Sequence, residues 1–181
     1  MSLRPVIGIV GSGGAFGRWL RGFFESRMGL QVIGHDPVDA GSQTPEQLLE
    51  QADVLLFSAP IRHTPALIRD YIRQSAGRER GKLWLDVTSI KRAPVEAMLA
   101  SRADVVGLHP MTAPPKAPTL KGRVMVVCEA RVDRWRAWLQ HGQRAGATLA
   151  SRAASAATPS TTPLVAHSNG NTVSPYKLNT M

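Results

Sequence analysis

The segment VVGLHP, residues 105–110, ends an apolar run on His109 and a proline. A neutral imidazole with a pKa of about 6.5 can accept a proton near neutral pH, which suits general-base catalysis. The proline restricts the backbone beside the ring and limits where the ring can point. The alternative is a loop histidine without a chemical role. The neighbouring motifs decide between these two interpretations.

A second stretch that could do chemistry is GSGGAFG, which follows the first apolar run and precedes a helix-patterned segment. Glycines there let the backbone approach a pyrophosphate, whose charge the helix N-terminus stabilises. The spacing departs from G-x-G-x-x-G, because Phe16 or Ser12 takes the place of a glycine in the two possible alignments. The alternative is an ordinary tight turn. The candidate cofactor-binding residues here are Gly11, Ser12, Gly13, Gly14, Ala15, Phe16 and Gly17.

Asp36 ends the second apolar run, about 20 residues after Gly17, the spacing at which an acidic residue binds the adenosine ribose in dinucleotide-binding folds. A carboxylate at this place repels a 2′-phosphate. We therefore predict NAD rather than NADP as the cofactor, although the neighbouring His35 could weaken that preference.

Three later apolar runs also end in polar or small residues. FSAP supplies Ser58, Ala59 and Pro60, which are small enough to pass beneath a nicotinamide ribose. The run LDVTSIK supplies Asp86, Thr88, Ser89 and Lys91, of which Thr88 is a further candidate for cofactor binding. Because ligands bind beyond the carboxyl ends of parallel strands, these loops and His109 would meet at one rim. No metal ion is expected.

The elements that must position these residues alternate along the chain. Expected strands cover residues 6–10, 30–34, 54–58, 83–87, 105–108 and 124–128, and expected helices cover 16–28, 45–51, 65–74, 94–100 and 132–144. Thr44 and Gln47 form a capping box around a first-turn proline. The alternation predicts an α/β fold of the Rossmann type, a doubly wound, mainly parallel sheet with helices on both faces.

Composition sets the limits. The 181 residues are 43% hydrophobic and 19% charged, which indicates one domain over residues 1–150 and an irregular, disordered tail over 151–181 rich in Ala, Ser, Thr and Pro. No apolar run approaches the ~18 residues of a membrane span. A single cysteine and the lack of a signal peptide favour the cytoplasm. The net charge of +9 is scattered, so we expect anionic small molecules rather than nucleic acid or membrane as partners.

Together, GSGGAFG, FSAPI, DVTSIKRAP and GLHPM resemble the nucleotide-binding domain of prephenate dehydrogenases, over roughly residues 5–150. The resemblance implies a Rossmann domain that binds NAD in an enzyme of tyrosine biosynthesis, which oxidatively decarboxylates prephenate to 4-hydroxyphenylpyruvate. It further implies that His109 interacts with the ring hydroxyl of the substrate and that Ser89 orients this histidine and the substrate. Relatives that act on arogenate or on an amino analogue of prephenate share the motifs. A domain that binds NAD without turnover is a second alternative, and a Rossmann protein whose basic surface binds nucleic acid is a third.

Two departures from the family pattern stand out. An aromatic residue and a glycine usually follow HPM, whereas this chain has Thr112 and Ala113. The resemblance also implies a C-terminal helical domain that forms the dimer and supplies a substrate-binding arginine, but residues 151–181 do not resemble it. Ser160-Thr161-Thr162 stands where the family has Glu-His-Asp, and the loss of one base from GAG-CAC-GAC would give these codons. The tail is therefore either frameshifted or a natural disordered segment.

Overall fold

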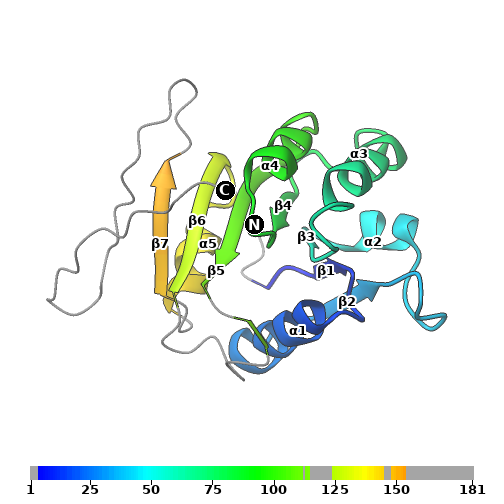
Figure 1. Cartoon of the computed structure of the whole chain (residues 1–181), viewed down its shortest axis with the longest axis horizontal. Helices are drawn as coiled ribbons and strands as arrows, with labels where there is room; N and C mark the ends of the chain where they lie inside the picture. The colour runs from blue at the N-terminus through cyan, green and yellow to red at the C-terminus, as the bar shows by residue number, and fades with distance from the viewer. Residues whose placement is uncertain (1–3, 112, 115–123, 145–147, 154–181) are drawn as a thin grey trace, which may run out of the picture.

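A computed structural model describes residues 4–111, 113–114, 124–144 and 148–153 (Figure 1). Its strands are β1 (Ile7–Val10), β2 (Val32–His35), β3 (Val54–Phe57), β4 (Leu83–Asp86), β5 (Asp104–Pro110), β6 (Val124–Arg131) and β7 (Thr148–Ala153). Its helices are α1 (Ala15–Met28), α2 (Pro45–Gln51), α3 (Thr64–Ser75), α4 (Arg92–Leu99) and α5 (Arg136–Arg144). The chain alternates between strand and helix except where β6 follows β5.

The strands form one sheet in the order β2-β1-β3-β4-β5-β6-β7. Strands β1 to β5 are parallel, β6 is antiparallel to β5, and β7 is parallel to β6. The chain leaves β1 toward one side for β2 and then crosses to β3 on the other side of β1. This reversal is the switch point at which doubly wound sheets bind ligands beyond the strand ends.

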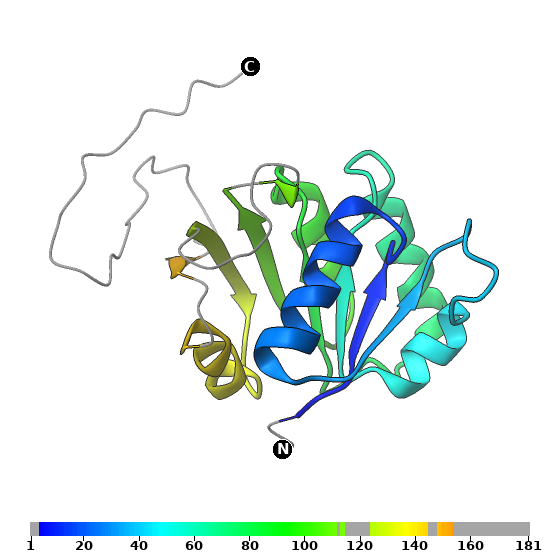
Figure 2. The ribbon, with the colours of Figure 1, turned by 90° about the horizontal axis from the view of Figure 1, so that it is seen from below.

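Helices cover both faces of the sheet (Figure 2). On one face, Leu20 and Phe24 of α1 pack on buried strand residues. Trp135, directly before α5, and Trp138, within α5, belong to the same core. On the other face, buried side chains of α2, α3 and α4 pack on a second core. The expected Rossmann-type fold is confirmed, and its strands are apolar on both sides because both sides are covered.

Helix α2 has its predicted bounds, the other predicted elements differ from theirs by one to four residues at one end or both, and one strand was not predicted. Strand β5 continues beyond Leu108 through Pro110, because β6 pairs with it to its end. Helix α5 begins at Arg136 rather than 132, because the preceding turn donates three backbone N–H groups to a carboxylate oxygen of Asp104. Strand β7 was not predicted and ends three positions past the expected domain boundary at residue 150. The rest of the expected tail, 154–181, lies outside the described residues.

Candidate active site

The glycine turn after β1 depends on close contact with the end of β3. Gly11 has a φ of +85° and donates its N–H to the carbonyl oxygen of His35 at 2.8 Å. A Cβ atom on Gly11 would lie 2.7 Å from the carbonyl oxygen of Ser58. Only glycine tolerates both the backbone angle and this approach, so the turn lies directly against the β3 end.

The start of α1 is equally tight. A Cβ atom on Gly17 would lie 2.2 Å from the carbonyl oxygen of Gly11, so a side chain there would push the helix away from the turn. The helix begins after Gly14, which supplies no side-chain cap, and its first turn contains no acidic residue. The N–H groups of this helix end therefore face a place suited to a pyrophosphate.

The other predicted residues of the turn differ in how far they are exposed to solvent. Ser12 is buried, and its N–H points to the carbonyl oxygen of His35 at 3.2 Å. Ala15 is the exposed first residue of α1, and Phe16 packs edge-on against Trp19. Their backbone, more than their side chains, is thus positioned to line a cofactor site.

Asp36 lies where the sequence predicts it, at the end of β2 and beside the glycine turn. One of its carboxylate oxygens, Oδ2, accepts the N–H of Gly13 at 2.9 Å, and Oδ1 accepts the N–H of Val38 at 3.2 Å. Asp36 is buried, so these bonds fix the direction of its carboxylate. A ribose held by this group would continue into a pyrophosphate over the turn.

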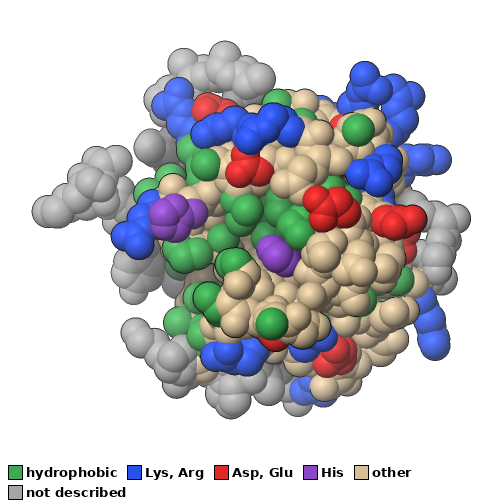
Figure 3. All heavy atoms as spheres, turned by 90° about the vertical axis from the view of Figure 1, so that its right-hand side faces the viewer, with side chains coloured by type: hydrophobic (Ala, Val, Ile, Leu, Met, Phe, Trp, Pro, Cys, Tyr) green, Lys and Arg blue, Asp and Glu red, His purple; other side chains and the backbone are tan. Residues whose placement is uncertain are grey.

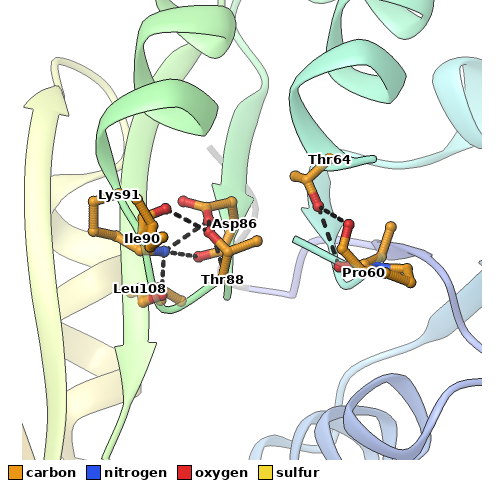
Figure 4. Close-up of polar contacts among 8 residues, drawn as sticks. Pro60, Thr64, Asp86, Thr88, Ile90, Lys91 and Leu108 are labelled. Atoms are coloured by element: carbon orange, nitrogen blue, oxygen red, sulfur yellow. Dashed lines mark hydrogen bonds and ion pairs between the residues drawn. The ribbon is translucent and has the colours of Figure 1, made fainter. Parts of the chain in front are cut away.

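The loop after β3 is held by Thr64, at the start of α3. The Thr64 hydroxyl donates toward the carbonyl oxygens of Ala59, at 3.1 Å, and Pro60, at 3.2 Å (Figure 4). Ser58 continues the β-ladder, since its N–H binds the carbonyl oxygen of Val10 at 2.8 Å. The small residues of this loop therefore form a fixed edge next to the glycine turn.

A buried ion pair lies at the end of β4. Lys91 Nζ is 2.7 Å from Asp86 Oδ2 and 2.6 Å from the carbonyl oxygen of Leu108, the residue before His109 (Figure 4). Thr88 donates both its hydroxyl, at 2.5 Å, and its N–H, at 3.0 Å, to the same carboxylate oxygen. Burial raises the pKa of Asp86 and lowers the pKa of Lys91, although their attraction acts in the opposite direction on both.

His109 lies near the end of β5, beyond the last residue pair that joins β5 to β4. Its Nδ1 atom is buried while the ring is partly exposed, which leaves Nε2 as the nitrogen able to reach a ligand. Burial lowers the pKa of His109, the positive charge of Lys91 lowers it further, and the negative charge of Asp86 acts against both. Burial and Lys91 thus favour the neutral imidazole, the form that can accept a proton.

Ser89 is the predicted residue whose role the geometry does not display. It is exposed on the loop after β4, and within the described part of the chain no hydrogen bond joins it to His109. Its orienting role stays a prediction. The sequence motif D-x-x-S-x-K did contain the groups that act around His109, but the bond from Lys91 to Leu108 joins positions 17 residues apart and follows only from the fold.

The rim of the sheet is apolar as well as polar. Four of the five large hydrophobic residues that are exposed in the described ranges follow the carboxyl ends of β2, β3, β4 and β5: Val38, Ile61, Ile90 and Met111. The β1 and β2 arrows point to the right of Figure 1, and Figure 3 views the molecule from that side. Hydrophobic side chains lie across its centre and left, a histidine side chain lies near the centre, and most basic side chains lie nearer the margin. Such a mixture suits a ligand with flat rings and charged ends.

Known proteins share both the sequence and this fold. No family model matches the chain. It is 34% identical over 150 residues to the T-protein of Enterobacter agglomerans, a chorismate mutase/prephenate dehydrogenase, a match that covers 81% of this chain and 38% of that protein. The chain belongs to the prephenate dehydrogenase family. The family resemblance seen in the motifs is thereby confirmed.

Solved structures support the same fold. A Synechocystis arogenate dehydrogenase aligns with a TM-score of 0.67 and 19% identity over 82% of this chain and 59% of its own. A Corynebacterium glutamicum protein described as a prephenate dehydrogenase aligns with a TM-score of 0.62 and 20% identity, over 82% and 56%. An imine reductase from Myxococcus stipitatus, solved with NADP+, aligns with a TM-score of 0.66 and 14% identity, over 82% and 55%. These likenesses show the fold of the chain.

The chain spans 38% of the T-protein and between 55% and 59% of these structures. In the ranges that the structure describes, no helix is long and apolar enough to cross a membrane.

Proposed function

We propose that the chain binds NAD as part of a dehydrogenase that oxidatively decarboxylates prephenate to 4-hydroxyphenylpyruvate. The order of the strands supports the cofactor. Asp36 at β2 suits the adenosine ribose, the glycine turn at β1 suits the pyrophosphate, and the rim from β3 to β5 then receives the nicotinamide. The 2.2 Å approach at Gly17 and the uncapped start of α1 fit a backbone that lies against a phosphate.

His109 carries the proposed chemistry. Held by Asp36 and the glycine turn, NAD would supply the acceptor for the hydride that leaves the ring carbon bearing the substrate hydroxyl. Nε2 of His109 accepts the hydroxyl proton. Loss of carbon dioxide then leaves its electron pair in an aromatic ring as a phenolate, whose oxygen takes the proton back from the imidazolium. Burial and Lys91 keep the imidazole unprotonated for this step. The single observation behind this proposal is a partly exposed imidazole, with Nδ1 buried, at the carboxyl end of β5.

The direct test is a steady-state assay of the chain with NAD and either prephenate or arogenate. Formation of NADH with prephenate supports the proposal, and a preference for arogenate would reassign the substrate.

His109→Ala should lower the turnover number by about 10²–10⁴-fold with little change in NAD affinity, because general-base catalysis contributes about that much. Ser89→Ala should lower it less, and a loss below about tenfold for His109→Ala would contradict the base role.

A second candidate follows from the coverage of the relatives. The chain spans 38% of the T-protein, and the resemblance assigns the substrate-binding arginine to a region outside the matched part. A domain that holds NAD without turnover would bind NAD in calorimetry and form no NADH with either substrate.

A further inference from the structure

Two buried polar atoms near Nε2 of the proposed base have no hydrogen-bond partner in the described part of the protein. One is Nδ1 of His109 itself, and the other is Oδ1 of Asp86. Asp86 is fully buried, and its other oxygen already binds Lys91 and Thr88. An unpaired carboxylate oxygen in such a place lowers stability unless something donates to it. An imidazole N–H is the chemical complement of that oxygen.

The strand register brings these two atoms to the same face of the sheet. Asp86 lies opposite Gly107 in the parallel pair of β4 and β5, so side chains at these positions share a face. His109, two residues after Gly107, points to that face as well. Asp86 Oδ1 is directed at β5, because a Cβ atom on Gly107 would lie 3.3 Å from it.

Lys91 fixes the rest of the arrangement. Its side chain crosses Gly107, where a Cβ atom would lie 2.9 Å from Lys91 Cδ, and its Nζ holds the carbonyl oxygen of Leu108. The charges that act on the imidazole are those of Asp86 and Lys91, and Cys128 on β6 acts on Lys91. Ser89, exposed on its loop, is not part of this buried group.

We propose that Asp86 is the positioning residue for His109, and that its Oδ1 accepts a hydrogen bond from His109 Nδ1, directly or through one water. The inference rests on the proposed function and deepens it. The bond fixes the proton on Nδ1, which leaves the lone pair of Nε2 free for the substrate hydroxyl. Asp86 does not touch the substrate and transfers no proton.

The test is the tautomer of His109 in the whole chain, read from ¹⁵N chemical shifts above the pH at which the ring is protonated. Labelled histidine gives signals from the five histidines, and His109→Gln identifies the one of interest. We expect His109 to carry its proton on Nδ1. A His109 signal dominated by the Nε2–H form, which free imidazole side chains favour, would overturn the proposal.

Two variants separate positioning from general structure. Asp86→Leu with Lys91→Met removes both charges together, so neither is left buried and unpaired. We expect His109 in this double variant to revert to the Nε2–H form while NAD affinity stays within about threefold, and an unchanged Nδ1–H form would refute the role of Asp86. Ser89→Ala is the matched control and should leave the tautomer unchanged, whereas a reversal there would give the role to Ser89.

The experiment does not depend on turnover. If the double variant does not fold, the tautomer of His109 in the unmodified chain still tests whether Nδ1 carries the proton. A chain that shows the Nδ1–H form and binds NAD but does not oxidise prephenate would refute the proposed function and leave the positioning role intact.

Discussion

The ring of His109 is affected by two charges of opposite sign, and burial together with Lys91 outweighs Asp86. Because the base must be unprotonated, activity falls as the pH drops through the pKa of His109. That pKa lies below its usual value of about 6.5, so activity should persist below the pH at which an ordinary histidine would be protonated.

Lys91→Met should raise the pKa of His109, because it removes the positive charge that lowers it. An NMR titration of the ring in both proteins measures this without any need for turnover. A pKa above about 6.5 in the unmodified chain, or no upward shift in the variant, would contradict the electrostatic account.

The carboxylate of Asp36 should determine the preference for NAD over NADP. Asp36→Ser removes the charge that opposes a 2′-phosphate, so the ratio of NADP to NAD dissociation constants should fall by roughly tenfold, on the order of 1.4 kcal/mol. Titration calorimetry with both cofactors gives the ratio. Asp39→Ser is a control of equal charge change on the same loop, and its ratio should stay close to that of the unmodified chain. Tighter NADP than NAD binding before any substitution would show that Asp36 does not select the cofactor.

Residue types and spacing were enough to predict that the candidate residues lie at one end of the sheet, but not to predict the contacts between them. Asp36 and the glycine turn lie together as predicted, because the motif determines a local strand-turn-helix geometry. The partners of Lys91 were not foreseen, since its bond to Leu108 requires α4 to lie over β5 in one particular register. Side-chain direction at Ser89 was equally beyond the reach of the sequence.

At the scale of elements, helix α1 offers an internal comparison between two glycines. Gly17→Ala places a Cβ atom 2.2 Å from the carbonyl oxygen of Gly11, so we expect a loss of about 1–3 kcal/mol in the free energy of unfolding and loss of NAD binding. Gly22 lies in the same helix, and a Cβ atom there would have no neighbour within 4 Å. Gly22→Ala should therefore raise the free energy of unfolding by about 0.5–1 kcal/mol through helix propensity. Urea denaturation measures both changes. Equal effects at the two positions would show that the tight turn is not maintained in solution.

Elements were predictable where their pattern is local. The capping box at Thr44 is present, with both reciprocal hydrogen bonds, and α2 has the expected bounds. Strand β7 lacked a sequence signal because its residues, TLASRA, are mostly small, and the strand forms by pairing with β6. The start of α5 depends on Asp104, which lies on strand β5, about thirty residues away in sequence.

At the scale of the whole molecule, helices cover both faces of the sheet, but apolar side chains remain exposed at the edge that the carboxyl ends of β2 to β5 form. The predicted order of cofactor groups runs along this edge from β2 to β5, so a bound dinucleotide would contact five successive strand ends. Binding at such an edge links the stability of the entire fold to ligand concentration, because the unfolded chain has no such site.

Thermal unfolding should therefore depend on NAD. At a free concentration of 100 times the dissociation constant, binding adds about 2.7 kcal/mol, which for a domain of this size raises Tm by roughly 5–10 °C. NADP at the same concentration should raise Tm less, because Asp36 repels its 2′-phosphate. Gly17→Ala should abolish the rise, whereas Gly22→Ala should retain it on a slightly higher baseline. A Tm that does not change with NAD, or that rises more with NADP, would mean that the edge from β2 to β5 does not hold the cofactor as proposed, whatever the fate of the dehydrogenase activity.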